Sequence, residues 1–222
     1  MSRAGSSLPK PLCEAGGIPL IVHVLRHLRA EGNQRFIVAL GHKQEVIRSY
    51  FDACPEPGLI LADTGENTQT GGRLRRIKPM LGGGGDFLVC YSDTLADVDV
   101  PRLLAFHKKH GRLATMLVAP WQERYGQVQL AGDEVVAFEE KPRIWVNAGY
   151  FLLKEEVLDL VEDDATSWER DCLSRLARDQ QLRAIPHEGF WMAVDTPEEL
   201  ARLDSLCREE ALPWKERLNC GC

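Results

Sequence analysis

The sequence predicts an α/β sandwich with a mainly parallel sheet and one antiparallel hairpin. First, short apolar segments alternate with amphipathic helical segments over most of the 222 residues, the order typical of a parallel sheet covered by helices. Second, no internal repeat or low-complexity linker divides the chain, so we expect residues 1–222 to form one domain. Third, residues 127–130 and 135–138 flank a turn at residues 131–134, which is a hairpin pattern.

The extended and helical segments can be placed in order along the chain. Pro9 and Pro11 keep the first interpretable residues extended. We expect strands at residues 35–40, 59–62, 87–91, 113–118, 145–153 and 182–185. We expect helices at residues 19–30, 43–51, 100–109 and 166–179, another after the Gly-rich stretch at residues 63–72, and a last one from Thr196 onward.

Local patterns support the less obvious helices. The helix at residues 43–51 is expected to turn Val46, Ile47 and Tyr50 toward the core. Thr166 has a glutamate three residues later, which is the spacing of a capping box, and predicts a helix start. Thr196 has the same spacing together with a proline at the first helical position.

Composition and charge exclude several classes of protein. The formal net charge of -6 argues against general binding of nucleic acid, which requires a basic surface. No apolar run approaches the roughly 20 residues that span a bilayer, and residues 1–7 lack the apolar core of a signal peptide. The seven cysteines are scattered and odd in number, as expected for reduced thiols in the cytoplasm.

A Gly-rich stretch at residues 63–76 is the most informative part of the sequence. A turn rich in Gly, Asn and Thr leads there from a strand into a basic helix. Glycines allow close approach of a ligand, and free N–H groups at a helix start favour an anion. Arg73 adds a forked donor suited to a phosphate or a base edge. The alternative interpretation is a solvated turn before a charged surface helix.

Charged and amide side chains also follow the predicted strands. They are Lys10, Arg73, Asp93, Lys141, Asn147 and Asp195. Two carboxylates can share one Mg²⁺, which accepts one or two carboxylates plus phosphate oxygens and water, and lysines can hold the phosphates beside it. This set predicts phosphoryl or nucleotidyl transfer, a chemistry of positioning and charge neutralisation. The chain has no Gly-x-Ser-x-Gly, His-Glu-x-x-His or Walker sequence that would favour another chemistry.

Five segments, in the same order, resemble the sugar-1-phosphate nucleotidyltransferases, with the closest likeness to glucose-1-phosphate cytidylyltransferases. They are Asp63-Thr-Gly-Glu-Asn-Thr-Gln-Thr-Gly-Gly-Arg-Leu74, Tyr91-Ser-Asp93, Glu139-Glu-Lys-Pro142, Phe190-Trp-Met-Ala-Val-Asp-Thr196 and Pro213-Trp-Lys215. The first and fourth segments are specific to the cytidylyl branch, whereas Glu-Lys-Pro is common to the wider family. The resemblance implies a Rossmann-like three-layer α/β/α sandwich of the nucleotide-diphospho-sugar transferase type, with a mixed, mostly parallel sheet and a small β excursion that holds the sugar.

The resemblance also implies roles for individual residues. Asp93 and Asp195 match the family's Mg²⁺ ligands, and Lys10 and Lys141 would offset phosphate charge. Expected at the nucleotide are Lys10, Thr68, Gly71, Gly72, Arg73 and Ser92, where Ser92 replaces a glycine of the family. Expected at the sugar 1-phosphate are Gly126, Glu140, Lys141, Asn147 and Gly149. The implied reaction is attack by the sugar phosphate on the α-phosphorus of CTP, which gives CDP-glucose and pyrophosphate.

The family opens with a buried strand and a Gly-rich phosphate loop, neither of which residues 1–8 resemble. We therefore expect a nucleotidyltransferase domain without these two features. Two other interpretations stay open: the same chemistry with another nucleotide or sugar phosphate, and a catalytically impaired relative that binds nucleotide sugars. The sequence leaves the oligomeric state open, a homo-oligomer included.

Two further patterns could bind a metal. His23 and His27 lie four residues apart on a predicted helix, although packing is the favoured interpretation because no third ligand is in view. Cys220 and Cys222 could hold a soft metal, but no histidine or second cysteine pair lies near them in the sequence.

Overall fold

The structure, a computed structural model, describes residues 8–209 and Leu212. Its α-helices are α1 (Leu20–Ala30), α2 (Gln44–Ala53), α3 (Thr70–Ile77), α4 (Val100–His110), α5 (Ser174–Arg178) and α6 (Pro197–Arg208). Shorter helical turns are η1 (Lys10–Leu12), η2 (Lys78–Met80), η3 (Glu155–Leu160) and the π-helical η4 (Trp168–Leu173). The strands are β1 (Glu14–Ala15), β2 (Ile18–Pro19), β3 (Phe36–Leu40), β4 (Leu59–Asp63), β5 (Asp86–Cys90), β6 (Thr94–Ala96), β7 (Ala114–Gln122), β8 (Gln127–Ala131), β9 (Glu134–Glu139), β10 (Arg143–Lys154), β11 (Leu182–Pro186) and β12 (Trp191–Ala193).

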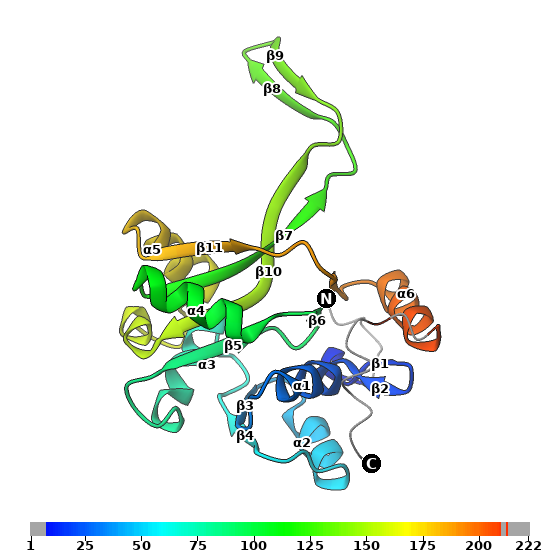
Figure 1. Cartoon of the computed structure of the whole chain (residues 1–222), viewed down its shortest axis with the longest axis vertical. Helices are drawn as coiled ribbons and strands as arrows, with labels where there is room; N and C mark the ends of the chain where they lie inside the picture. The colour runs from blue at the N-terminus through cyan, green and yellow to red at the C-terminus, as the bar shows by residue number, and fades with distance from the viewer. Residues whose placement is uncertain (1–7, 210–211, 213–222) are drawn as a thin grey trace.

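The central sheet has the order β11-β7-β10-β5 (Figure 1). β11 runs parallel to β7, and β10 runs antiparallel to both β7 and β5. β3 and β4 form a separate parallel pair, and β6 pairs with β12. The sheet is thus mixed, and the predicted Rossmann-like α/β class is confirmed.

The core has two parts, one on each face of the sheet. Tyr150 and Leu152 of β10 belong to a cluster that includes the apolar faces of α1, α4 and α6. Phe151 and Leu153 belong to a second cluster formed with α3, η4 and α5. Successive residues of a strand point to opposite faces, so β10 is covered by helices on both sides, as a three-layer sandwich requires.

The hairpin β8–β9 extends away from this body (Figure 1). It continues from the ends of β7 and β10, and every residue of its two strands is exposed. Large apolar side chains are among them, including Leu130 at 64% and Phe138 at 63% exposure. The predicted antiparallel excursion is confirmed, and it is an arm rather than part of the layered body.

Most expected elements are confirmed within a few residues, but three details were wrong. Residues 10–12 form the helical turn η1 and are not extended as expected. Val46 is 38% exposed, so it does not face the core as Ile47 does. The N-cap before η4 is Ser167, whose hydroxyl accepts from the N–H of Arg170. Thr166, the expected cap, instead donates to Asp163 and closes a turn at residues 163–166. The short strands β1, β2 and β6 had no strand prediction because two or three residues give no periodic signal. The strand expected just before Asp195 is confirmed as β12.

Candidate active site

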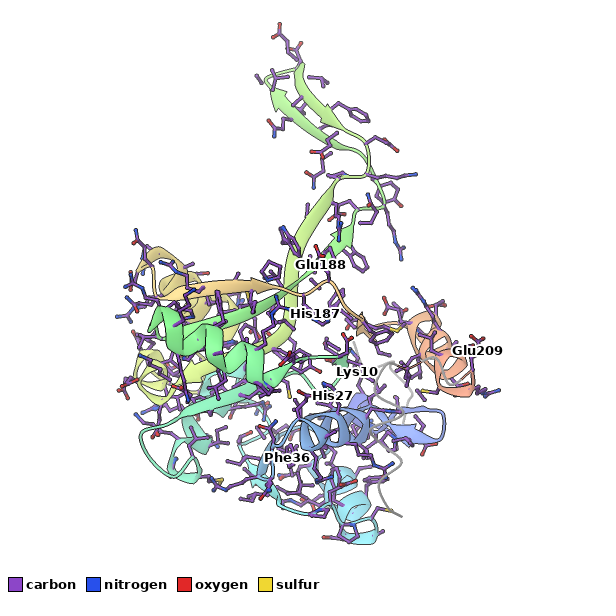
Figure 2. The ribbon with its side chains drawn as sticks, viewed as in Figure 1. Lys10, His27, Phe36, His187, Glu188 and Glu209 are labelled. Atoms are coloured by element: carbon purple, nitrogen blue, oxygen red, sulfur yellow. The ribbon has the colours of Figure 1, made fainter. Side chains whose placement is uncertain are left out.

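Three of the predicted site residues converge at one point. The ammonium nitrogen of Lys10 lies 2.7 Å from Oδ2 of Asp93 and 2.6 Å from Oδ1 of Asp195. Lys10 is in the first turn of the described chain, Asp93 follows β5, and Asp195 follows β12. Figure 2 shows Lys10 in the body of the molecule, well below the arm. Residues from three distant parts of the sequence therefore form one ionic cluster at the end of the sheet.

The protonation state of Lys10 follows from its surroundings. Partial burial alone would lower the pKa of its ammonium group, but hydrogen bonds to Asp195 and Asp93, and their charges, raise it above 10.5. The side chain therefore stays protonated at neutral pH. A permanent positive charge at this position is suited to holding a phosphate.

Local hydrogen bonds hold the two carboxylates in position. The backbone N–H of Val194 donates to the carbonyl of Asp93 at 2.9 Å, which joins the two site strands beside their acidic residues. Thr196 and Glu199 form the capping box of α6, as predicted. Oε2 of Glu199 also accepts from the N–H of Asp195 at 2.7 Å. The helix start thus orients the backbone that carries Asp195.

The carboxylates of Asp93 and Asp195 fit a two-carboxylate Mg²⁺ site. Their oxygens bind one ammonium group, so they are close enough for a single cation to replace it. Within residues 8–209 no group of three or more His, Cys, Asp or Glu side chains is placed to hold a metal. Mg²⁺ does not need such a group when phosphates and water complete its octahedron.

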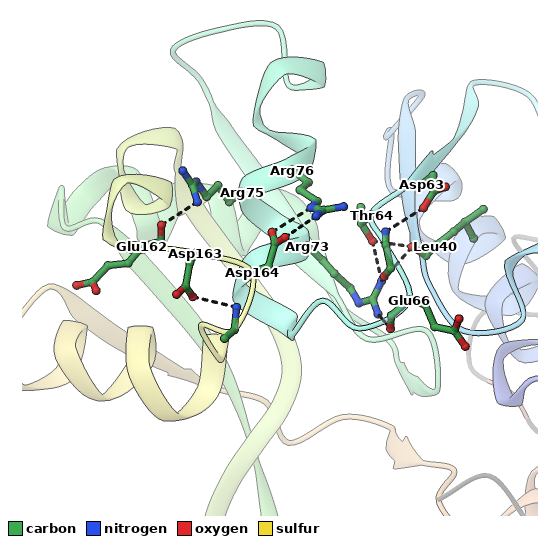
Figure 3. Close-up of polar contacts among 12 residues, drawn as sticks. Leu40, Asp63, Thr64, Glu66, Arg73, Arg75, Arg76, Glu162, Asp163 and Asp164 are labelled. Carbon is green, nitrogen blue, oxygen red and sulfur yellow. Dashed lines mark hydrogen bonds and ion pairs between the residues drawn. The ribbon is translucent and has the colours of Figure 1, made fainter.

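Arg73 is engaged within the protein (Figure 3). Nη1 donates to the carbonyl of Leu40 at 2.9 Å, to the hydroxyl of Thr64 at 2.7 Å and to the carbonyl of Gly65 at 2.9 Å. Nη2 donates to the carbonyl of Glu66 at 3.3 Å. Burial, with the nearby charge of Arg76, lowers the pKa of Arg73 below its ordinary value. In this structure the hydrogen bonds of the guanidinium group hold the loop after β4 against the end of β3.

The glycines at the start of α3 serve close packing. A Cβ atom on Gly71 would lie 2.7 Å from the carbonyl oxygen of Thr166, and one on Gly72 would lie 2.7 Å from Cα of Asp164 and from Cγ2 of the buried Thr68. The N–H of Gly72 donates to the carbonyl of Thr166 at 3.2 Å. The expectation of an open helix start with free N–H groups was therefore wrong for Gly72, because the chain at residues 163–168 covers it.

A second polar network connects this helix start with the strand that leads to Asp93. The hydroxyl of Tyr91 donates to Oε1 of Glu169 at 2.5 Å, and that of Thr70 donates to Oε2 at 2.7 Å. The pKa of Tyr91 is raised by burial and by this carboxylate. The sequence did not indicate these roles of Tyr91 and Glu169, because the only pattern at Glu169 was the capping-box spacing from Thr166.

Asn147 and Gly149 lie beside the same network. The amide nitrogen of Asn147 is 3.4 Å from the hydroxyl of Tyr91, and its oxygen accepts from the N–H of Gly149 at 2.8 Å. Gly149 has a φ of 78°, and a Cβ there would lie 2.9 Å from the Tyr91 ring. Glycine is therefore required at this irregular point of β10. Ser92 lies next to Asp93 and is half-buried.

The remaining predicted sugar-phosphate residues lie at the root of the arm. Gly126 precedes β8, and Glu140 and Lys141 follow β9. Nζ of Lys141 is 3.8 Å from Oε1 of Glu140, and both side chains are more than half exposed. The structure thus brings Lys10, Asp93 and Asp195 together and places Ser92, Asn147 and Gly149 nearby. Among the described residues, no hydrogen bond or ion pair joins Gly126, Glu140 or Lys141 to them.

The other metal candidates have different outcomes. Nε2 of His23 lies 2.9 Å from the carbonyl of Ala15, and Nε2 of His27 lies 3.2 Å from that of Val98. Both histidines are buried, which confirms the packing interpretation. Cys220 and Cys222, and the Pro213-Trp-Lys215 segment, lie outside the described residues. None of the helices in the described part of the chain has the length and apolarity to cross a membrane.

Comparison with known proteins agrees with this geometry. The Nucleotidyl transferase family model matches residues 5–209. Glucose-1-phosphate cytidylyltransferase of Salmonella typhimurium is 34% identical over 93% of this chain and 91% of its own. A probable glucose-1-phosphate cytidylyltransferase of Bacillus subtilis is 30% identical over 97% and 94%. A probable mannose-1-phosphate guanylyltransferase of rice is 33% identical over 86% and 56%.

Solved structures show the same fold. HddC from Yersinia pseudotuberculosis, complexed with GMP-PN, has a TM-score of 0.73 at 18% identity and covers 92% of each chain. A putative glucose-1-phosphate thymidylyltransferase from Bacillus anthracis has a TM-score of 0.73 at 16% identity, covering 99% of this chain and 94% of its own. Together with the family match, these findings show that the chain belongs to the nucleotidyl transferase family, among the sugar-1-phosphate nucleotidyltransferases.

Proposed function

We propose that this protein joins CTP and glucose 1-phosphate to give CDP-glucose and pyrophosphate. The observation that carries the proposal is the convergence of Lys10, Asp93 and Asp195 at the end of the sheet. The choice of nucleotide and sugar is supported by the Salmonella relative, which is named glucose-1-phosphate cytidylyltransferase and matches 93% of the chain. We also propose a cytoplasmic location, which the scattered cysteines favour.

In the proposed reaction an oxygen of the sugar phosphate attacks the α-phosphorus of the nucleotide. The bond from that phosphorus to the bridging oxygen of the β-phosphate breaks, and pyrophosphate leaves with that oxygen. Lys10 keeps its proton throughout and offsets the negative charge of the phosphates. Asp93 and Asp195 would hold a Mg²⁺ ion, which supplies Lewis-acid charge neutralisation when bound. No residue of the chain forms a covalent bond to the substrate.

The other residues would bind and orient the substrates. On the nucleotide side we propose Ser92 and Thr68. Gly71 and Gly72 allow the close packing of the helix start beside them, and Arg73 fixes the loop. On the sugar side we propose Asn147 and Gly149, which adjoin Tyr91. Further sugar-phosphate contacts would come from the root of the arm: Gly126, Glu140 and Lys141.

Two alternatives have specific support. The guanylyltransferase relative, 33% identical over 86% of the chain, favours another nucleotide and sugar phosphate. The hydrogen bonds that occupy Arg73 and the N–H of Gly72 favour a catalytically impaired relative that binds nucleotide sugars.

Pyrophosphate release by the purified chain separates these functions. Each assay contains Mg²⁺ and glucose 1-phosphate or mannose 1-phosphate with one of CTP, UTP, dTTP, ATP or GTP. The proposal predicts the highest kcat/KM for CTP with glucose 1-phosphate. A preference for GTP with mannose 1-phosphate would contradict the choice of substrates. CDP-glucose binding without release under any condition would support the impaired relative.

A further inference from the structure

The backbone of Lys141 has an unusual conformation. Its φ is 46°, in the left-handed region that residues with a side chain rarely occupy. Among the described residues, Lys43 and Gln180 are the other non-glycine residues with a positive φ. Lys43 is the N-cap of α2 and Gln180 follows α5, so both lie where a helix begins or ends. Lys141 lies between two strands, and its conformation needs another explanation.

The residue after Lys141 makes this conformation more costly. Pro142 favours extended backbone in the residue that precedes it, because its ring crowds the N–H and Cβ of that residue. Every residue from 127 to 141 is exposed, whereas Pro142 is buried. The proline therefore anchors the end of the arm to the body, and Lys141 is the last exposed residue before that anchor.

Hydrogen bonds from the end of β7 hold the corner at Lys141 in place. The side-chain amide of Gln122 donates to the carbonyl of Lys141, and the N–H of Glu123 donates to the carbonyl of Pro142 at 3.1 Å. Gln122 is also the partner of Arg143 in the ladder between β7 and β10. A strained conformation persists where its surroundings fix it, and these two bonds fix two consecutive carbonyl groups.

The bend at this corner does not itself require a lysine. The chain passes here from the arm to the body (Figure 1), and a glycine would adopt the left-handed conformation without a steric cost. Strained residues with a side chain gather at sites where function needs that side chain in a fixed place. Because a lysine occupies a position that suits glycine, the explanation lies in its side chain.

The side chain of Lys141 lies with the other residues proposed for the sugar phosphate at the root of the arm. Its Nζ is 3.8 Å from Oε1 of Glu140, and both side chains are more than half exposed. A Cβ atom on Gly126 would lie 3.0 Å from Oε2 of Glu140, so the two chain segments at the root meet here. An exposed ammonium group that is held at a fixed point is suited to binding a phosphate as a point charge.

We propose that Gln122 is a positioning residue for the sugar phosphate: together with the N–H of Glu123 it holds Lys141 in the left-handed conformation, which keeps the ammonium group at the root of the arm. The inference rests on the proposed function, in which Lys141 binds the sugar phosphate. Gln122 acts only through Lys141. Without its hydrogen bond, the backbone of Lys141 relaxes toward the extended conformation that Pro142 favours, and this redirects the lysine side chain.

The conformation of Lys141 is tested without any substrate. In ordinary exposed backbone glycine is less favourable than alanine, and where φ is positive this order is reversed. We therefore expect Lys141→Gly to have a higher melting temperature than Lys141→Ala. The same pair of substitutions at Gln180 calibrates the effect of a positive φ. The pair at Glu139, an exposed position of β9, should show the opposite order.

Amide hydrogen exchange at Glu123 gives a local measure of the same effect, because the arm can loosen separately from the body. The N–H of Glu123 is protected only while it donates to the carbonyl of Pro142. We expect slower exchange at this amide in Lys141→Gly than in Lys141→Ala, in agreement with the melting temperatures.

Binding of glucose 1-phosphate tests the role of Gln122, and isothermal titration calorimetry measures it without turnover. Gln122→Leu keeps the approximate size of the side chain and removes the donor. We expect its dissociation constant for glucose 1-phosphate to rise about fivefold or more, and that for CTP to change by less than about twofold. In the Lys141→Ala background Gln122→Leu should have no further effect. Gln129→Leu, at an exposed position of β8, is the matched control and should change neither constant.

Several results would overturn the proposal. A Lys141→Gly variant that melts no higher than Lys141→Ala would show that the lysine is not strained. Equal dissociation constants of the wild type and Gln122→Leu for glucose 1-phosphate would show that Gln122 does not position Lys141. An equal loss of affinity in the Lys141→Ala background would show that Gln122 acts by another route. These results leave the proposed function standing, whereas a wild-type chain that does not bind glucose 1-phosphate would contradict that function as well.

Discussion

At the scale of single residues, Glu169 connects more of the structure than its sequence context indicates. Its carboxylate accepts from Tyr91 after β5, from Thr70 at the start of α3, and from Ser167. These hydrogen bonds lower its pKa even though burial alone would raise it. The sequence could not predict this network, since Tyr91 and Thr70 are brought to Glu169 only by tertiary packing.

Replacing this carboxylate by an amide should loosen the network. In Glu169→Gln the three hydrogen bonds accepted from hydroxyl groups become neutral or lose their geometry, and we expect the free energy of unfolding to fall by about 1–2 kcal/mol. The matched control Glu198→Gln lies in the exposed first turn of α6 and should change stability by less than about 0.5 kcal/mol. Equal urea midpoints for the two variants would contradict the role given to Glu169.

His107 predicts a pH dependence of stability. It is fully buried with Nδ1 2.7 Å from the hydroxyl of Thr115, and burial lowers its pKa below 6.5 against the opposing charge of Asp86. The unfolded state then binds a proton at a higher pH than the folded state. Stability should therefore be full above about pH 6.5 and fall as the pH decreases below it. His107→Gln should reduce the decrease in the free energy of unfolding between pH 7 and pH 5, measured by urea unfolding. An unchanged decrease would exclude His107 as its source.

At the scale of elements, prediction succeeded where a segment carries its own signal. Apolar runs such as residues 59–62 and 87–91 correspond to β4 and β5, and Thr196 and Glu199 mark the start of α6. Prediction failed where two adjacent residues could both serve as the cap of one helix. At residues 166–169 two adjacent hydroxyls could cap the helix, and the turn with Asp163 takes Thr166, which leaves Ser167 as the cap.

The capping box of α6 is expected to act on stability and on the site. Thr196→Ala removes the side-chain acceptor for the N–H of Glu199 and should lower the free energy of unfolding by about 1 kcal/mol. Ser205→Ala is the control: it lies on the same helix, and its hydroxyl donates to the carbonyl of Ala201. Its effect should stay within about 0.5 kcal/mol. If both variants unfold at the same temperature, the box does not stabilise the helix start.

At the scale of the whole molecule, the order of elements predicted the class of fold but not which strand edges pair. Strand ends identified Lys10, Asp93 and Asp195 as candidates, and the structure places them within one ionic cluster. The separation of the arm from the layered body depends on which strand edges pair. A single sequence does not indicate that pairing, because the residues of a strand show how deeply the strand is buried but not which strand it pairs with.

The central claim is that this cluster performs nucleotidyl transfer, and the most direct measurement is pyrophosphate release with CTP, glucose 1-phosphate and Mg²⁺ by the wild-type chain and Asp93→Asn. Asp133→Asn, a carboxylate in the turn of the arm, is the matched control. We predict release by the wild type and the control, and a loss of at least about 100-fold in Asp93→Asn at an unchanged melting temperature. Undiminished release by Asp93→Asn, or no release by the wild type, would contradict the claim.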